Sequence, residues 1–160
     1  ANAAAREPVL VWHDVFERGG CYRGHGPDAI EGGPGLGRLA IAAQIGDDPD
    51  RCVIEDSIED DGWWRGRRRE TDDQCVARAK ALASKLQRRF TDGEVVVMII
   101  HAEFKRALMA EMLGPGVDPH LFGPINNTGV SKLMGTDSGW RLQWFNSITH
   151  LPSPMITEPW

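Results

Sequence analysis

Residues 95–104, VVVMIIHAEF, constrain the fold more than any other stretch of this sequence. Six apolar residues run without interruption up to His101, and a helical pattern begins directly after it. An unbroken apolar run of this length is typical of a strand buried on both faces in a parallel sheet. We therefore expect residues 95–100 to form a central parallel strand with His101 at its carboxyl end, facing a pocket.

Helical patterns lie on both sides of this predicted strand. Apolar residues recur at steps of three and four over residues 72–90 and again over 102–113, so both stretches are predicted helices. Residues 38–45 suit a further short helix, and residues 9–12 suit a short strand. Between these two, residues 19–37 are rich in glycine and predict a long loop without regular structure.

The period of the pattern changes near the C-terminus. Over residues 127–146 apolar and polar positions alternate around a Gly/Asp/Ser turn, which predicts two strands joined as a hairpin. The order helix, strand, helix and hairpin predicts an α/β protein, layered α/β/α with a mostly parallel sheet. At 160 residues, the chain suits a single domain spanning residues 1–160.

Composition limits the classes of protein to which the chain can belong. Hydrophobic residues make up 41% and charged residues 26%, and no apolar run approaches the ~20 residues of a membrane span. The formal net charge of −5 argues against a nucleic-acid partner. A dense basic stretch over residues 65–69 is interpreted as a solvated loop, with an acidic partner or a phosphate as the alternative. Three widely spaced cysteines predict an intracellular, reducing compartment, cytoplasm or organelle matrix.

Two residues could carry chemistry. His101, at a strand end beside free helix amides, could hold an anion, although a hydrogen-bonded core histidine is an equal reading. Glu17, between a short strand and Gly-Gly, could be a general acid if burial raises its pKa, but a surface glutamate is the simpler reading. His13 and the motif at residues 23–26, RGHG, are read as structural or loop residues. No histidine or cysteine spacing predicts a metal, and no cofactor is expected.

Four blocks of the sequence carry a resemblance to a known family. They follow one another in order between about residues 9 and 152: HDVFERGGCYRGHGPDAIEGGPGLGR, GWWRGRRRETDDQCVARAKAL, VVVMIIHAEFKRALMAEML and INNTGVSKLMGTDSGWRLQWFNSITHLP. The chain resembles the histidine phosphatase superfamily, the phosphoglycerate mutase-like proteins. The resemblance implies that Glu17 occupies the acid position and that His101 is the second, phosphate-contacting histidine. It also implies that Asn127 and Thr128 lie near the phosphate pocket.

The sequence departs from the family pattern at the nucleophile. The Arg-His-Gly motif, which the resemblance places at the end of the first strand, is absent, and Ala102 follows His101 where glycine is common. We therefore expect a domain incomplete at its N-terminus, whose sheet is completed by another polypeptide or by a missing N-terminal segment.

This reading leaves the function open between two classes. In the first, the chain is a non-catalytic subunit or scaffold of a larger assembly. In the second, it is the C-terminal part of an active phosphatase or mutase acting on a phosphomonoester. In either class a phosphorylated small molecule is a candidate ligand, and a module that binds it without turnover is a third reading.

Overall fold

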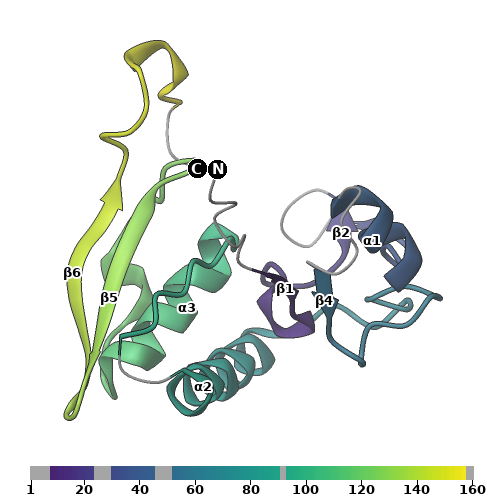
Figure 1. Cartoon of the computed structure of the whole chain (residues 1–160), viewed down its shortest axis with the longest axis horizontal. Coiled ribbons are helices and arrows are strands. Elements are labelled where there is room, and N and C mark those ends of the chain that lie inside the picture. The colour runs from purple at the N-terminus through teal and green to yellow at the C-terminus, as the bar shows by residue number, and fades with distance from the viewer. Residues whose placement is uncertain (1–7, 24–29, 46–51, 91–92, 158–160) are drawn as a thin grey trace, which may run out of the picture. The chain divides into compact units, whose positions relative to one another are not determined.

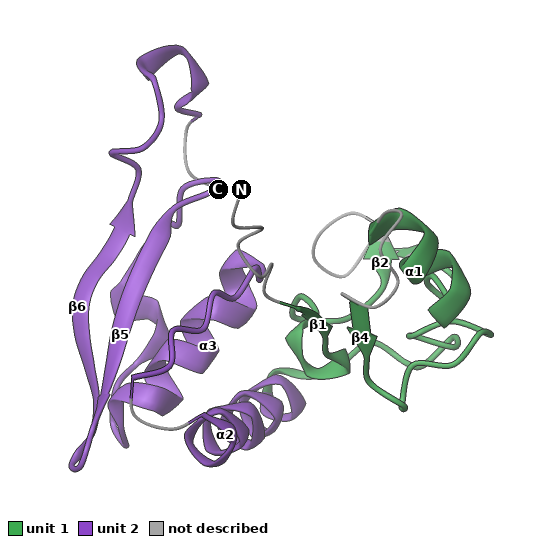
Figure 2. Cartoon of the chain, viewed as in Figure 1, with its two compact units in different colours: residues 1–72 green, residues 73–160 purple. Residues whose placement is uncertain are grey.

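The computed structural model describes residues 8–23, 30–45, 52–90 and 93–157 (Figure 1). The chain divides into two compact units, residues 1–72 and residues 73–160 (Figure 2). Helices and strands both occur, which confirms the α/β class. The elements are, in chain order, β1 (Val9–Val11), η1 (His13–Val15), β2 (Tyr22–Arg23), β3 (Ile30–Glu31), α1 (Arg38–Ile45), β4 (Cys52–Ile54), α2 (Asp72–Arg89), α3 (Ala102–Leu113), η4 (Pro119–Phe122), β5 (Val130–Thr136), β6 (Gly139–Ser147) and η5 (Ser153–Met155).

The first unit is built on a parallel pair of strands. β1 pairs with β4, with Leu10 opposite Val53, and α1 contacts β4. The predicted strand at 9–12 and the predicted helix at 38–45 are both confirmed. The glycine-rich stretch is less irregular than predicted, because β2 and β3 form a short antiparallel pair within it.

Arg38 fixes the segment that follows β4. Its Nε donates to the carbonyl oxygen of Ile58 at 3.0 Å, Nη1 to that of Ile54 at 3.1 Å and Nη2 to that of Glu55 at 2.8 Å. A planar guanidinium with five donors can serve three carbonyl groups at once, which an ammonium group cannot do in the same geometry. One side chain therefore satisfies three backbone acceptors, one at the end of β4 and two in the segment after it.

Aromatic rings form the interior of the first unit. Trp64 is 2% exposed, and its ring lies 5.4 Å from that of Phe16. The ring of Trp63 lies 5.5 Å from Phe16 on the same cluster. Gly20, with φ +92°, sits against Trp64 so closely that a Cβ there would overlap the indole ring. The Gly-Gly pair therefore lets the loop after Phe16 close over this cluster.

The buried residues of the second unit lie mainly on α2 and α3. The predicted helices at 72–90 and 102–113 are confirmed by α2 and α3. α2 buries Leu82 and Leu86, spaced one helical turn apart. Phe104 on α3 is fully buried, and the guanidinium of Arg78 lies 3.9 Å from its ring centroid. This geometry is a cation–π contact between the two helices.

The predicted hairpin is confirmed by β5 and β6. The two strands are antiparallel, with Leu133 opposite Leu142 and Thr136 opposite Gly139, and the register shifts near Lys132. α3 contacts β6 and η4, so one face of the hairpin is joined to the helix (Figure 1). The second unit is thus a helical pair with an antiparallel ribbon.

The predicted central strand at 95–100 is wrong. These residues form no strand, and among the described strands none pairs with them. Val95, Val97 and Ile99 are 90%, 85% and 94% exposed, and His101 after them is also exposed. An apolar run reports the environment that a segment prefers, whereas a strand also needs a neighbour for its backbone hydrogen bonds. No such neighbour lies beside this segment in the described residues.

Candidate functional site

His101 lies at the start of α3 in the second unit. It is the N-cap residue, with φ −89° and ψ 160°, and its carbonyl oxygen accepts a hydrogen bond from the Lys105 amide at 2.9 Å. Its imidazole makes no capping bond and is exposed. His101 therefore directly precedes the free amides of the first helical turn, a position that suits an anion. Its position before a helix is as predicted, but its position after a buried strand is not.

Asn127 and Thr128 lie in a tight turn immediately before β5. The amide of Gly129 donates to the carbonyl oxygen of Asn126 at 2.9 Å, and Thr128 has φ +56°. The Asn127 side chain donates from Nδ2 to Oγ1 of Thr157 at 2.9 Å. Both Asn127 and Thr128 are exposed, so their polar groups are accessible to a ligand.

Lys105 joins this turn to the helix of His101, and sequence reasoning missed it. Its Nζ donates to the carbonyl oxygen of Gly129 at 2.8 Å, from one helical turn beyond His101. Burial lowers the pKa of Lys105, because desolvation penalises the charged ammonium. The structure thus brings the helix of His101 and the turn of Asn127 and Thr128 together through a partly buried cation. A lysine within a helical pattern gave no sequence signal of this contact.

Glu17 lies in the first unit, in the loop after η1. Its Oε1 accepts a hydrogen bond from the Arg18 amide at 2.6 Å, and its carbonyl oxygen accepts one from Gly20 at 3.0 Å. The side chain is half-buried. The carboxylate is therefore held by its own loop. Glu17 and His101 belong to different units, and their implied roles, the acid and the phosphate contact, stay predictions.

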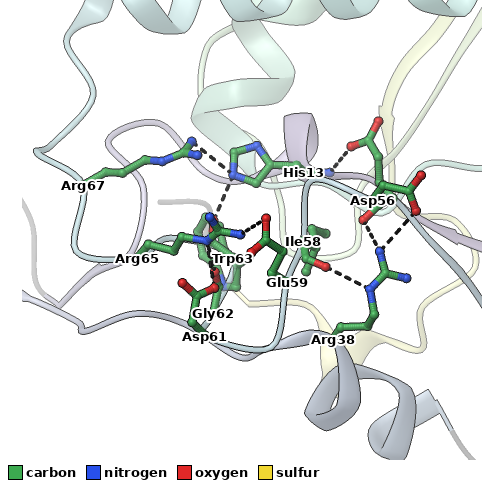
Figure 3. Close-up of polar contacts among 11 residues, drawn as sticks. His13, Arg38, Asp56, Ile58, Glu59, Asp61, Gly62, Trp63, Arg65 and Arg67 are labelled. Carbon is green, nitrogen blue, oxygen red and sulfur yellow. Dashed lines mark hydrogen bonds and ion pairs between the residues drawn. The ribbon is translucent and has the colours of Figure 1, made fainter.

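A second cluster in the first unit surrounds His13 (Figure 3). His13 Nε2 lies 3.0 Å from the carbonyl oxygen of Trp63 and 3.5 Å from Nη1 of Arg67. The backbone amide of His13 donates to a Glu55 carboxylate oxygen at 2.8 Å. The sequence interpretation of His13 as a structural or loop residue did not include this pairing with an arginine 54 positions away.

The arginines of the basic stretch are not equivalent. Arg65 pairs with Glu59 at 2.9 Å and with Asp61 at 2.8 Å, and the hydrogen bond to Glu59 is the main reason that its pKa is raised. Arg67 has no carboxylate within ion-pair distance in the described part of the chain. Residues 65–69 are all exposed and belong to no helix or strand, which confirms the solvated-loop interpretation; within the loop Arg65 is paired and Arg67 faces a histidine.

The described residues were compared with the requirements of a metal site and of a membrane-spanning helix. No group of three or more His, Cys, Asp or Glu side chains in these ranges could hold a metal ion. Among the helices of these ranges, none has the length and apolar character needed to span a membrane. Cys21, Cys52 and Cys75 are free thiols.

Comparison with known proteins gives one result. The family model of the histidine phosphatase superfamily (branch 1) matches residues 44–148, more than half of the 160 residues. His101, Asn127 and Thr128 lie inside the matched range, whereas His13 and Glu17 lie before it. Comparisons with curated proteins and with solved structures returned no match.

Proposed function

Because the chain belongs to the histidine phosphatase superfamily, we propose that it is a phosphoglycerate mutase-like protein that is non-catalytic by itself and acts as a subunit or scaffold of a larger assembly. We further propose that residues 1–160 form one histidine phosphatase-like domain, completed by a strand from another polypeptide or from an N-terminal segment outside these residues. Its free cysteines support a reducing compartment, cytoplasm or organelle matrix.

The exposed apolar run at 95–100 is the observation that carries this proposal. Val95, Val97 and Ile99 are each at least 85% exposed, whereas Met98 and Ile100 are half-buried. Exposure that alternates in this way is typical of an extended segment covered on one face only. Burial of three such side chains is worth roughly 4–9 kcal/mol in total, which is large beside the net stability of a small domain. This segment therefore suits pairing with a further strand.

The proposed lack of turnover rests on the absence of the motif that carries the nucleophilic histidine. The 160 residues contain no Arg-His-Gly triplet, the motif that carries the nucleophilic histidine in the family pattern. A phosphohistidine intermediate needs a histidine in line with phosphorus and cations that neutralise the transferred group. In this proposal His101 contacts phosphate, Asn127 and Thr128 border it, and Glu17 keeps the acid position without a step to serve.

The retained residues favour a second candidate function, the C-terminal part of an active phosphatase or mutase acting on a phosphomonoester. The exposed imidazole of His101 at a helix start and the half-buried carboxylate of Glu17 suit phosphate contact and proton donation. In this alternative the strand that pairs with residues 95–100 also brings the nucleophilic histidine. Both proposals include a strand from outside these residues and differ only in what that strand carries.

An assay on a generic aryl phosphate tests the proposal. The purified chain should give no turnover above blank, because loss of a nucleophile removes about 10⁶ in rate in a well-studied protease. The His101→Ala variant should also read as blank. Turnover by the chain alone that disappears in His101→Ala would make His101 the nucleophile and overturn the proposal. Turnover only after addition of a segment carrying Arg-His-Gly would establish the second candidate.

A further inference from the structure

We propose that Arg67 and His13 form a binding site for a phosphate or phosphomonoester group in the first unit. Two arginines of one loop, Arg65 and Arg67, differ in their partners. Arg65 is neutralised by two carboxylates, Glu59 and Asp61. In the described residues Arg67 has no such partner, and its guanidinium points instead toward the ring of His13 (Figure 3).

The proton on the His13 ring decides what this contact is. The carbonyl oxygen of Trp63 can only accept a hydrogen bond, and the guanidinium of Arg67 can only donate one. His13 Nε2 cannot serve both with a single proton. Since the carbonyl oxygen is nearer, at 3.0 Å against 3.5 Å for Arg67 Nη1, we place the proton on Nε2, where it is donated to Trp63.

With that tautomer, Arg67 Nη1 and His13 Nε2 are both donors, and only the Nε2 proton has an acceptor, the Trp63 carbonyl oxygen. Arg67 Nη1–H and His13 Nε2–H both carry positive partial charge, and their nitrogens are 3.5 Å apart. An oxyanion placed beside them can accept from the guanidinium and share the imidazole proton. The planar fork of arginine suits two oxygens of one such group.

Charge favours phosphate over a carboxylate at this place. Arg67 is followed by Arg68 and Arg69, so three guanidinium groups stand in succession. Arg69 also lies 5.9 Å from the centroid of the Tyr22 ring, and Tyr22 Oη donates to the Arg67 carbonyl oxygen at 3.5 Å. These contacts hold the loop of residues 65–69 against Tyr22. A dianion gains more than a monoanion from the Arg67 guanidinium, and the Glu55 carboxylate, bound to the His13 amide at 2.8 Å, offsets part of that gain.

The contacts that define this site are independent of the proposed function, which assigns phosphate contact to His101. The test is a titration of the 160-residue chain with sodium phosphate at constant ionic strength, followed by the NMR signals of the Arg67 Nε–H and of the His13 ring nitrogens. We expect saturable shifts of both, and a long-range ¹⁵N spectrum that shows His13 protonated on Nε2. Sodium acetate should bind at least about threefold more weakly, as a monoanion in the same field.

Two variants that each replace an arginine by an uncharged glutamine distinguish a specific binding site from nonspecific electrostatic attraction. Arg67→Gln should weaken phosphate binding by about tenfold, because a charge-assisted hydrogen bond is lost. Arg68→Gln removes the same charge from the next position and should weaken binding by less than about twofold. If Arg67→Gln alters the fold, Arg67→Lys replaces it and should cost about threefold by loss of the planar fork.

Three results would overturn the inference. The first is the absence of saturable shifts. The second is equal weakening by Arg67→Gln and Arg68→Gln, which means nonspecific attraction. The third is binding that is lost in His101→Ala and kept in Arg67→Gln, which assigns the phosphate to His101 and supports the proposed function instead.

Discussion

Replacing Arg38 by lysine should destabilise the first unit by about 2 kcal/mol. Arg38 donates to three carbonyl oxygens, of Ile54, Glu55 and Ile58, at 2.8–3.1 Å. Lysine keeps the charge but can reach at most one of these acceptors in good geometry, so two hydrogen bonds are lost. Because the side chain is 35% exposed, each lost bond is worth about 1 kcal/mol, less than the upper value for a charged donor.

The ion pair of Arg38 with Asp56 provides the control. The two groups lie 3.5 Å apart, but the Asp56 side chain is fully exposed, so solvent screening leaves the pair little effect on stability. Urea unfolding is followed by tryptophan fluorescence, to which Trp63 and Trp64 contribute from the first unit and Trp140 and Trp144 from the second. We expect Arg38→Lys to lower the urea midpoint clearly and Asp56→Asn to leave it nearly unchanged. Equal effects of both variants would show that the ion pair, and not the carbonyl bonds, fixes this loop.

Three further substitutions test side-chain burial and packing within each of the two units. Phe104→Ala should cost about 3–5 kcal/mol of unfolding free energy, since the ring is fully buried; a thermal melt with a loss below about 1 kcal/mol would contradict this core. Gly20→Ala should destabilise the chain more than Gly33→Ala in urea unfolding. Both glycines have φ +92°, but only a Cβ at Gly20 would meet the Trp64 ring; equal losses would show that this contact does not affect stability. Wild type should gain stability relative to Lys105→Met as pH rises from the lowered pKa of Lys105 toward 10.5, since the unfolded chain binds more protons there; parallel stability curves would contradict the burial of this ammonium.

The helices and the hairpin could be predicted from the sequence because their signals are local. α1, α2 and α3 begin and end within one residue of the predicted ranges, and the alternation over 127–146 placed β5 and β6. Amphipathic period and turn residues act within the segment itself. Residues 95–100 failed for the opposite reason, since strand formation there depends on a neighbour that no local pattern can supply.

The candidate site divides along the same line. The position of His101 at a helix start and of Asn127 before a strand could be predicted, because each follows from the element beside it. The Lys105 bond to Gly129 and the approach of Arg67 to His13 join positions 24 and 54 apart. Neither residue type has a spacing rule that links it to such a partner. These contacts could be found only once the fold was known.

Amide hydrogen exchange of residues 95–100 in the isolated chain tests the central claim most directly. In the proposed function this segment is an open strand position, with Val95, Val97 and Ile99 exposed. We expect its amides to exchange at nearly the rate of an unstructured peptide, while the amides of α3 are strongly protected. Protection of residues 95–100 equal to that of α3 would show that the strand is already paired within this chain, and would contradict the need for a strand from outside.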